Sequence, residues 1–307
     1  MSDTKLKIIY VAGAGRSGTT IVDRVLGAIN GVTSFNEVYR LWEEGFSSNN
    51  MCACGAHFRQ CQFWNEVIKE SFGTDIDSVD IEAITKLHHT FDHSRHVPKL
   101  LRGKMDAEDQ AALMQYSERL KALYAAMIRH SGTEICVDSS KVPSRPLLLN
   151  NMEGVQVNVL HIIRDPRAVV YAWNKKKFNP ATGEYLKKNE TSGSISAWLA
   201  RNILSKKIMK QIPGVTIRYE DFALQPRATI QRVIDELPLL NGLDNPFVTE
   251  NSIDLPKLHS IGGNPHRFKS GMTDIRFDDE WKRKMPMLDR MGVSLVTLPW
   301  LIKYGYL

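Results

Sequence analysis

The segment Lys7-Ile-Ile-Tyr-Val-Ala12, followed by Gly13-Ala-Gly-Arg-Ser-Gly-Thr-Thr20, decides the fold of this 307-residue chain. The first part is a short apolar run rich in β-branched residues, which predicts a buried strand. The second part is a glycine-rich turn, and a helical pattern begins at Ser17 or Gly18. A strand, a glycine-rich turn and a helix N-terminus together bind phosphate-like anions, because backbone N–H groups and the helix dipole favour negative charge there.

Further apolar segments continue this alternation of strands and helices. We expect strands at residues 32–35, 134–137, 155–163 and 215–219, and helices at 166–176, 194–211 and 226–237. Strands that alternate with helices form parallel sheets covered on both faces. The sequence therefore predicts an α/β fold in three layers, P-loop-like, with a central parallel sheet of about five strands.

Residues 75–130 interrupt the alternation with a polar, helical pattern. We interpret them as a helical cap inserted into one domain that spans residues 1–307. The chain shows no internal repeats and no linker of low complexity that would divide it. The apolar stretch 293–300 is expected to pack back onto the body of the protein.

The composition is that of an ordinary globular protein, with 43% hydrophobic and 24% charged residues. A net charge of +6 suits an anionic ligand but is too small to indicate nucleic acid, and no basic face is interleaved with aromatic residues. No stretch approaches 18 consecutive apolar residues, so we expect no membrane span. The N-terminus lacks the pattern of a signal segment, which predicts a cytoplasmic protein.

The glycine-rich turn differs from a nucleotide triphosphatase loop in one informative position. Gly13-x4-Gly18 matches the front half of a Walker loop, but Thr19 stands where such an enzyme has lysine. Without that lysine, and without an evident aspartate to hold magnesium, the loop is poorly suited to a triphosphate. Arg16 instead supplies a guanidinium fork that matches sulfate or phosphate oxygens. A P-loop kinase that uses ATP is therefore the weaker alternative.

A second candidate anion site lies at the end of the strand expected at 155–163. Arg164 follows this strand, and Pro166 suits the first turn of the next helix. Because parallel strands end at one edge of a sheet, Arg164 and the loop at 13–20 fit a ligand with anionic groups at both ends. A salt-bridged helix start at Arg164-Asp-Pro-Arg167 is the alternative.

The two sites together resemble the PAPS-dependent sulfotransferases, where PAPS is 3′-phosphoadenosine 5′-phosphosulfate. Gly15-Arg-Ser-Gly-Thr-Thr20 resembles the family's 5′-phosphosulfate loop, and Arg164 resembles the arginine that binds the 3′-phosphate. Residues 198–202, 217–222 and 259–268 extend the resemblance to bacterial members. It implies transfer of a sulfuryl group from PAPS to a hydroxyl acceptor, with release of PAP (3′,5′-diphosphoadenosine).

The resemblance also implies the residues that bind PAPS. Tyr219 is expected to approach the adenine, and a C-terminal segment at about 255–285 is expected to close over the donor. Ala172 departs from the family, which has serine there; Arg167 or the late basic segment would have to replace its hydroxyl. The predicted donor-binding residues are Gly15, Arg16, Ser17, Gly18, Thr19, Thr20, Arg164, Tyr219, Arg267 and Lys269.

Three residues are the catalytic candidates. Glu37 follows the second expected strand, where several sulfotransferase branches carry a catalytic glutamate. Lys141 ends the third strand, where other branches have histidine. We assign Glu37 as the base and Lys141, with Arg16, as groups that offset developing charge. The alternatives are a helix-start carboxylate without chemistry for Glu37, and a plain binding or salt-bridge role for Lys141.

The sequence specifies the acceptor and any metal site less closely than the donor. The acceptor is a small-molecule, lipid or carbohydrate hydroxyl, and a non-catalytic PAP-binding module remains an alternative. Because sulfate carries less charge than phosphate, the transfer requires no metal, and we expect no metal site. The run Cys52-x-Cys54-x2-His57-x3-Cys61 offers four possible zinc ligands at unusually tight spacing, so a disulfide, a zinc site and plain packing all stay open.

Overall fold

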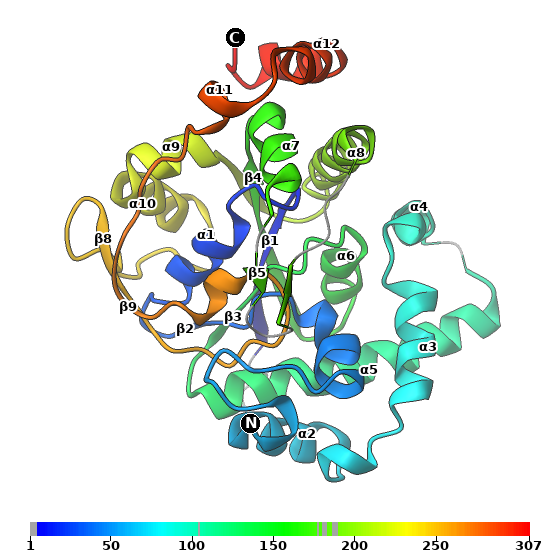
Figure 1. The fold of residues 1–307 in the computed structure, drawn as a ribbon. Coiled ribbons are helices and arrows are strands. Elements are labelled where there is room, and N and C mark those ends of the chain that lie inside the picture. The colour runs from blue at the N-terminus through cyan, green and yellow to red at the C-terminus, as the bar shows by residue number, and fades with distance from the viewer. Residues whose placement is uncertain (1–4, 104, 177, 180–182, 186–189) are drawn as a thin grey trace.

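The computed structural model describes residues 5–103, 105–176, 178–179, 183–185 and 190–307. Its centre is a five-stranded, wholly parallel sheet in the order β2-β3-β1-β4-β7 (Figure 1). The strands are β1 (Leu6–Gly13), β2 (Val32–Ser34), β3 (Ile135–Asp138), β4 (Val155–Ile163) and β7 (Gly214–Arg218). The predicted fold class is confirmed, and each expected strand differs from the observed one by at most one residue at either end.

Helices cover both faces of the sheet, so the fold has three layers (Figure 1). One face carries α1 (Thr19–Leu26), α9 (Tyr219–Leu224) and α10 (Pro226–Glu236). The other carries α5 (Ala107–Ser131), α6 (Ser144–Asn150) and α8 (Thr191–Ile208). At one end lie α7 (Pro166–Asn174), α11 (Trp281–Lys284) and α12 (Met287–Lys303). Two antiparallel strand pairs lie outside this sheet: β5 (Phe178–Asn179) with β6 (Glu184–Tyr185), and β8 (Ser252–Leu255) with β9 (Gly271–Asp274).

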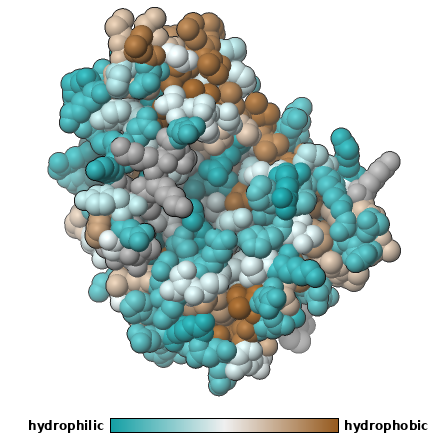
Figure 2. Space-filling model, turned by 45° about the vertical axis from the view of Figure 1, so that its right-hand side comes forward, coloured by the Kyte–Doolittle hydropathy of each residue, from teal (hydrophilic) through white to brown (hydrophobic). Residues whose placement is uncertain are grey.

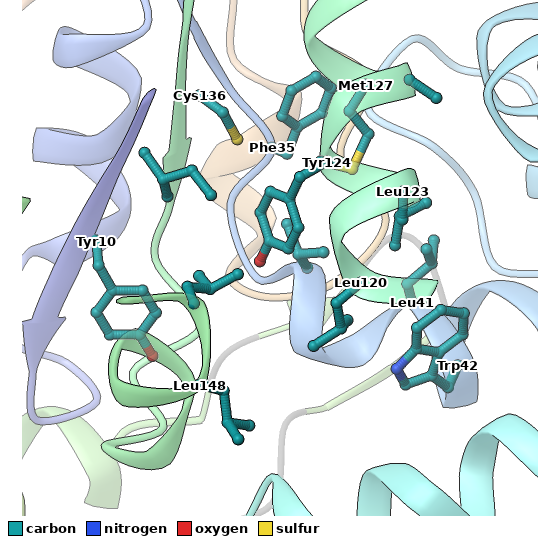
Figure 3. Close-up of a cluster of buried hydrophobic side chains, with 14 of the residues drawn as sticks. Tyr10, Phe35, Leu41, Trp42, Leu120, Leu123, Tyr124, Met127, Cys136 and Leu148 are labelled. Atoms are coloured by element: carbon teal, nitrogen blue, oxygen red, sulfur yellow. The ribbon is translucent and has the colours of Figure 1, made fainter. Parts of the chain in front are cut away.

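Alternate side chains of β1 explain the two apolar cores. Ile8 and Tyr10 enter the core beneath α5, whereas Ile9 and Val11 enter the core beneath α1. A strand buried on both faces needs apolar residues at every position, which the run Lys7–Ala12 nearly supplies. Figure 3 shows the first core, where Tyr124 of α5 lies between Cys136 of β3 and the rest of the helix, and Leu123 lies near Leu41 on the other side.

The connection between β2 and β3 holds the helices α2 (Gln62–Phe72), α3 (Ile81–Phe91), α4 (Val97–Arg102) and α5. Three of them fall within the range where the cap was expected. The carboxylate of Asp106 caps the N-terminus of α5 by accepting from the N–H of Asp109, and left-handed Gly132 ends the helix. Because α5 is buried against the sheet, it is part of the main core rather than an outlying lid. The division into one domain with an insertion stays a prediction.

A buried polar network ties α3 to α6, the helix that follows β3. The carboxylate of Asp92 pairs with the guanidinium of Arg145 on α6, and it also accepts from the hydroxyl of Ser144 at 3.0 Å. His88 and Tyr116 join the same network through a 3.0 Å contact between Nδ1 and the phenol oxygen. All of these side chains are completely buried. The network therefore fixes the insertion to the segment that carries Lys141.

The C-terminal helix α12 packs back with one side only. Val293 and Leu301 are fully buried, whereas Leu288 is 84% exposed and Leu295 is 71% exposed. Figure 2 shows the resulting hydrophobic surface at the top of the molecule, over α12. The expected packing of residues 293–300 is therefore only half realised. Among the described helices, none is both long and apolar enough to cross a bilayer.

Candidate active site at the carboxyl edge of the sheet

The glycine-rich loop between β1 and α1 has the shape of an anion-binding turn. Gly18 has a φ of 84°, and a Cβ there would lie 2.2 Å from the ring of Tyr219, so only glycine fits. No side chain caps the N-terminus of α1. Helices leave their first N–H groups without intrahelical partners, which here include those of Thr19 and Thr20. The hydroxyl of Ser17 is also buried without a hydrogen-bond partner among the described residues.

Three non-glycine residues with left-handed backbone follow three neighbouring strands. They are Arg16 after β1 (φ 67°), Asn36 after β2 (φ 54°) and Lys141 after β3 (φ 61°). This conformation is unfavourable for an arginine or lysine, and such residues gather at sites where geometry serves function. Backbone strain therefore gathers at the carboxyl edge of the sheet, which makes this edge the candidate active site.

Glu37 lies at this edge between two basic side chains. Its Oε1 accepts from the Nζ of Lys141 at 2.6 Å, and its Oε2 accepts from the Nε of Arg40 at 2.6 Å. Burial alone raises the pKa of Glu37, but Lys141 and Arg40 outweigh burial and lower it to about 2. The two catalytic candidates Glu37 and Lys141 thus form one ion pair.

Lys141 is as buried as its partner. Besides Glu37, its Nζ donates to the carbonyl of Ser139 at 2.9 Å. Burial lowers the pKa of Lys141, while the adjacent Glu37 carboxylate opposes that change. The positive charge of Lys141 is therefore stabilised by the Glu37 carboxylate. Another anion that replaced Glu37 beside the ammonium would have the same effect.

Two further guanidinium groups lie around this pair. Burial lowers the pKa of Arg16 and of Arg201, and the nearby Glu37 carboxylate opposes the shift in both. Arg16 stacks on the ring of Trp173 at 4.8 Å. Arg201 Nη1 lies 3.6 Å from the point where a Cβ on Gly15 would be. Within the described part of the chain, neither guanidinium forms an ion pair, so positive charge exceeds negative charge at the loop.

Sequence reasoning did not single out Arg201 or Arg40. Both belong to helical stretches whose sequence pattern indicates only that one side packs on the core. They come near Glu37 because α8 and the segment after β2 lie close together at this edge of the sheet. The only local signal for Arg201 was its place in the segment 198–202.

Arg164 joins the end of β4 to the same loop. Its Nη1 donates to the carbonyl of Arg16 at 3.0 Å, and its guanidinium stacks on the ring of Tyr219 at 4.4 Å. The adjacent strands β1 and β4 continue to opposite sides of the sheet, to β2 and β7. Ligands of open α/β sheets bind at such a switch point. The predicted donor residues from Gly15 to Thr20, with Arg164 and Tyr219, therefore do come together.

The profile of a family described as the sulfotransferase family matches residues 9–239, about three quarters of the sequence. The chain belongs to the sulfotransferase family. A comparison with curated proteins finds no match.

Three solved structures are similar to this sulfotransferase. The "Sulfotransferase Domain from the Synechococcus PCC 7002 Olefin Synthase" is 16% identical, with a TM-score of 0.49 and coverage of 95% of this chain and 94% of that one. The "Sulfotransferase Domain from the Curacin Biosynthetic Pathway" is 15% identical, with a TM-score of 0.45 and coverage of 94% and 96%. A sulfotransferase from Mycobacterium tuberculosis H37Rv is 12% identical, with a TM-score of 0.38 and coverage of 76% and 68%.

Arg167 of the sulfotransferase is already engaged. Its guanidinium pairs with Asp165 through Nη2 and Oδ2 at 2.6 Å, and Nη2 also donates to the carbonyl of Tyr306 at 2.8 Å. A group held on two sides is poorly placed to replace the hydroxyl missing at Ala172. Arg167 thus has the salt bridge that the alternative describes, whereas Arg164 donates to the loop and also lies 3.8 Å from Oδ2 of Asp278.

Arg267 and Lys269 lie elsewhere than Arg164 in the described structure. Arg267 is buried, and its Nη2 donates to the carbonyl of Met51 at 2.9 Å. Its own carbonyl accepts from Arg24 of α1 at 2.8 Å. Lys269 is exposed near Asp274. The segment that carries them does pass over the site, because a Cβ on Gly263 would lie 2.7 Å from Oε1 of Glu37. Their contact with the donor stays a prediction.

Proposed function

We propose that this sulfotransferase transfers a sulfuryl group from PAPS to a hydroxyl acceptor and releases PAP. The observation that carries the proposal is the surplus of positive charge at the phosphate loop. Arg16, Arg40, Lys141 and Arg201 lie around the carboxylate of Glu37, and Arg40 also pairs with Glu44. A site with four cations and two carboxylates on a glycine-rich turn favours a ligand with several negative charges.

A kinase that uses ATP is disfavoured at the same loop. Thr19 is buried at the position where a nucleotide triphosphatase has lysine. Asp138 ends β3, where a magnesium-binding aspartate would be expected, but its carboxylate accepts from the N–H of Ser140 and the phenol of Tyr124. That carboxylate is therefore occupied within the core.

The proposed reaction is an in-line displacement at sulfur. The acceptor oxygen bonds to sulfur while the bond between sulfur and the bridging oxygen breaks, and that oxygen leaves on PAP with the electron pair. Glu37 takes the proton of the acceptor hydroxyl, and Lys141 and Arg16 offset the charge that develops on the transferred and leaving oxygens.

The ion pair between Glu37 and Lys141 has a specific part in this proposal. A carboxylate with a pKa of about 2 is ionised but is a weak base. An anionic donor in the loop gives Lys141 another partner, and a carboxylate that loses a cationic neighbour becomes more basic. We infer that donor binding moves Lys141 away from Glu37 and thereby prepares Glu37 to accept the proton.

A non-catalytic PAP-binding module is the second candidate, because two cations lower the pKa of Glu37 and so make it a weak base. The two candidates differ in turnover rather than in binding. The acceptor that we expect is a small molecule, a lipid or a carbohydrate with a hydroxyl group, with no role for nucleic acid. The expected location is the cytoplasm.

The test combines labelled PAPS, a panel of hydroxyl acceptors and two matched variants. Glu37→Gln should keep PAP binding and lose at least about 100-fold in turnover, because the amide accepts no proton. Glu44→Gln is the control: Glu44 also pairs with Arg40, at 2.7 Å, but not with Lys141, and its loss should leave turnover within about threefold of wild type.

The outcomes separate the candidates. Transfer from PAPS but not from ATP with magnesium supports the proposal. PAP binding without transfer to any acceptor in the panel supports the binding module. Full turnover in Glu37→Gln contradicts the assignment of the base.

A further inference from the structure

Four metal-ligating side chains meet at one point outside the proposed active site. Cys52, Cys54 and Cys61 come from the connection between β2 and β3, and His259 comes from the segment after β8. One ligand atom of each residue lies within 4.8 Å of all the others. Residues almost 200 positions apart in the sequence therefore present three thiols and an imidazole to a common centre.

The spacing of these atoms is that of a tetrahedral zinc site. Zinc binds thiolate sulfur at about 2.3 Å and imidazole nitrogen at about 2.0–2.1 Å, so tetrahedral sulfur atoms lie about 3.8 Å apart and sulfur and nitrogen about 3.6 Å apart. Here Sγ of Cys61 lies 3.7 Å from Sγ of Cys54 and 3.9 Å from Sγ of Cys52. Nδ1 of His259 lies 3.3 Å from Sγ of Cys61 and 3.9 Å from Sγ of Cys52.

The backbone holds the four residues in this arrangement. Gly55, with a φ of 100°, closes a turn in which its N–H donates to the carbonyl of Cys52 at 2.9 Å. The N–H of Ala53 donates to the carbonyl of Ser260 at 2.9 Å and so joins the two segments. Phe63 stacks on the ring of His259 with centroids 4.6 Å apart. The imidazole is thereby oriented with Nδ1 toward the sulfur atoms.

The histidine within the cysteine run is directed elsewhere. His57 is exposed, and its Nδ1 lies 2.9 Å from the carbonyl of Asn49. Of the four possible ligands in the cysteine run, His57 therefore lies outside the cluster, and His259 is the histidine that reaches the sulfur atoms. A single disulfide uses two of the three sulfurs and leaves unexplained the convergence of the third with the imidazole.

We propose that Cys52, Cys54, Cys61 and His259 bind one zinc ion in a closed, structural site. Four protein ligands leave no open coordination position, so the ion takes no part in the transfer reaction. Binding releases the thiol protons and leaves three thiolates on a divalent cation, a net charge of −1 that the nearby guanidinium of Arg267 offsets. The sequence-based expectation of no metal site is replaced by this proposal.

The zinc ion would couple the C-terminal segment to the segment that follows β2. His259 precedes Gly263, where a Cβ would lie 2.7 Å from Oε1 of Glu37, and Arg267, which donates to Met51 beside Cys52. Outside the cluster, the contacts that hold residues 256–268 include those from Arg24 of α1 to the carbonyls of Pro256 and Arg267. The site therefore anchors the segment expected to cover the donor.

The experiment measures metal in the full-length protein, purified without chelator in a reductant that does not bind metal. We expect about one zinc per chain by mass spectrometry of the metal content. His259→Ala and Cys54→Ser should lower zinc affinity at least about 100-fold. His57→Ala is the matched control and should retain the ion, because its imidazole faces away from the sulfur atoms. Circular dichroism of each variant reports whether the fold is kept.

A second readout does not depend on any variant. Cobalt added to the chelated wild-type protein should give the absorption of a tetrahedral thiolate complex. Removal of zinc should expose residues 255–285 to limited proteolysis, independently of sulfuryl transfer. The proposal is overturned if the protein holds no zinc and takes up no cobalt, if peptide mapping finds a disulfide among the three cysteines, or if His57→Ala loses metal as fully as His259→Ala.

Discussion

At the scale of single residues, Gly18 illustrates how closely the loop is fitted to its surroundings. Its left-handed backbone and the ring of Tyr219 leave no room for a side chain. Gly31 offers a comparison, since its φ of 79° is similar but a Cβ there meets nothing within 4 Å. The two glycines therefore separate the effect of backbone strain from that of the contact with Tyr219.

Gly18→Ala should abolish PAP binding, whereas Gly31→Ala should leave it unchanged. Each variant should lose about 1 kcal/mol of stability because alanine disfavours a positive φ, and Gly18→Ala should lose more because its Cβ overlaps the ring of Tyr219. Only the first displaces Tyr219 and, with it, the stacked Arg164. Titration calorimetry with PAP and chemical denaturation give the two quantities. Equal PAP affinities in both variants would show that Tyr219 does not set the shape of the loop.

The low pKa of Glu37 predicts how the stability of the protein changes at acid pH. Its pKa is about 2 in the folded protein and 4.5 as its ordinary value. The unfolded chain therefore binds the proton more readily, so the stabilisation by Glu37 is complete above about pH 5 and is lost as the pH falls toward 2. The free energy of unfolding of Glu37→Gln should depend less steeply on pH in this window than that of wild type. Parallel slopes would place Glu37 outside the ion pair.

At the scale of elements, the buried pair of Asp92 and Arg145 holds α3 to α6. Asp92→Ala should destabilise the protein by roughly 3–5 kcal/mol, because it leaves a buried guanidinium without its carboxylate. Asp77→Ala, which removes a pair with Arg59 at an aspartate that is 73% exposed, should cost less than about 1 kcal/mol. Urea denaturation compares them. A similar small loss in both would mean that the network contributes little to holding the insertion.

The strands and helices could be predicted from the local pattern of apolar residues, whereas the contacts between distant elements could not. A β-branched run such as Val155–Ile163 specifies its strand, and Pro166 marks the start of its helix to the residue. By contrast, Arg201 reaches Glu37 and His259 reaches Cys61 only because distant segments pack together. Periodicity carries no information about such contacts. The loop and Arg164 were found because strand ends of one parallel sheet must share an edge.

At the scale of the whole molecule, the central place of β1 governs the order in which the fold can form. Residues 7–10 pair with residues 135–138 of β3, and residues 6–13 pair with residues 155–162 of β4. Both partners of this apolar strand thus lie more than 120 residues further along the chain. At about 5–20 residues per second, ribosomal synthesis leaves β1 without either neighbour for several seconds.

Refolding should therefore proceed from local helices to the sheet. The 25-residue helix α5 needs only local contacts to begin, whereas β1 must wait for the closure of two long loops. Pulsed hydrogen exchange should show the amides of α5 protected before those of Ile8 to Val11. Simultaneous protection of both would contradict this order. Until that late step, the strand that leads into the phosphate loop is an exposed apolar segment, and nascent chains should depend on chaperones to keep it from aggregating.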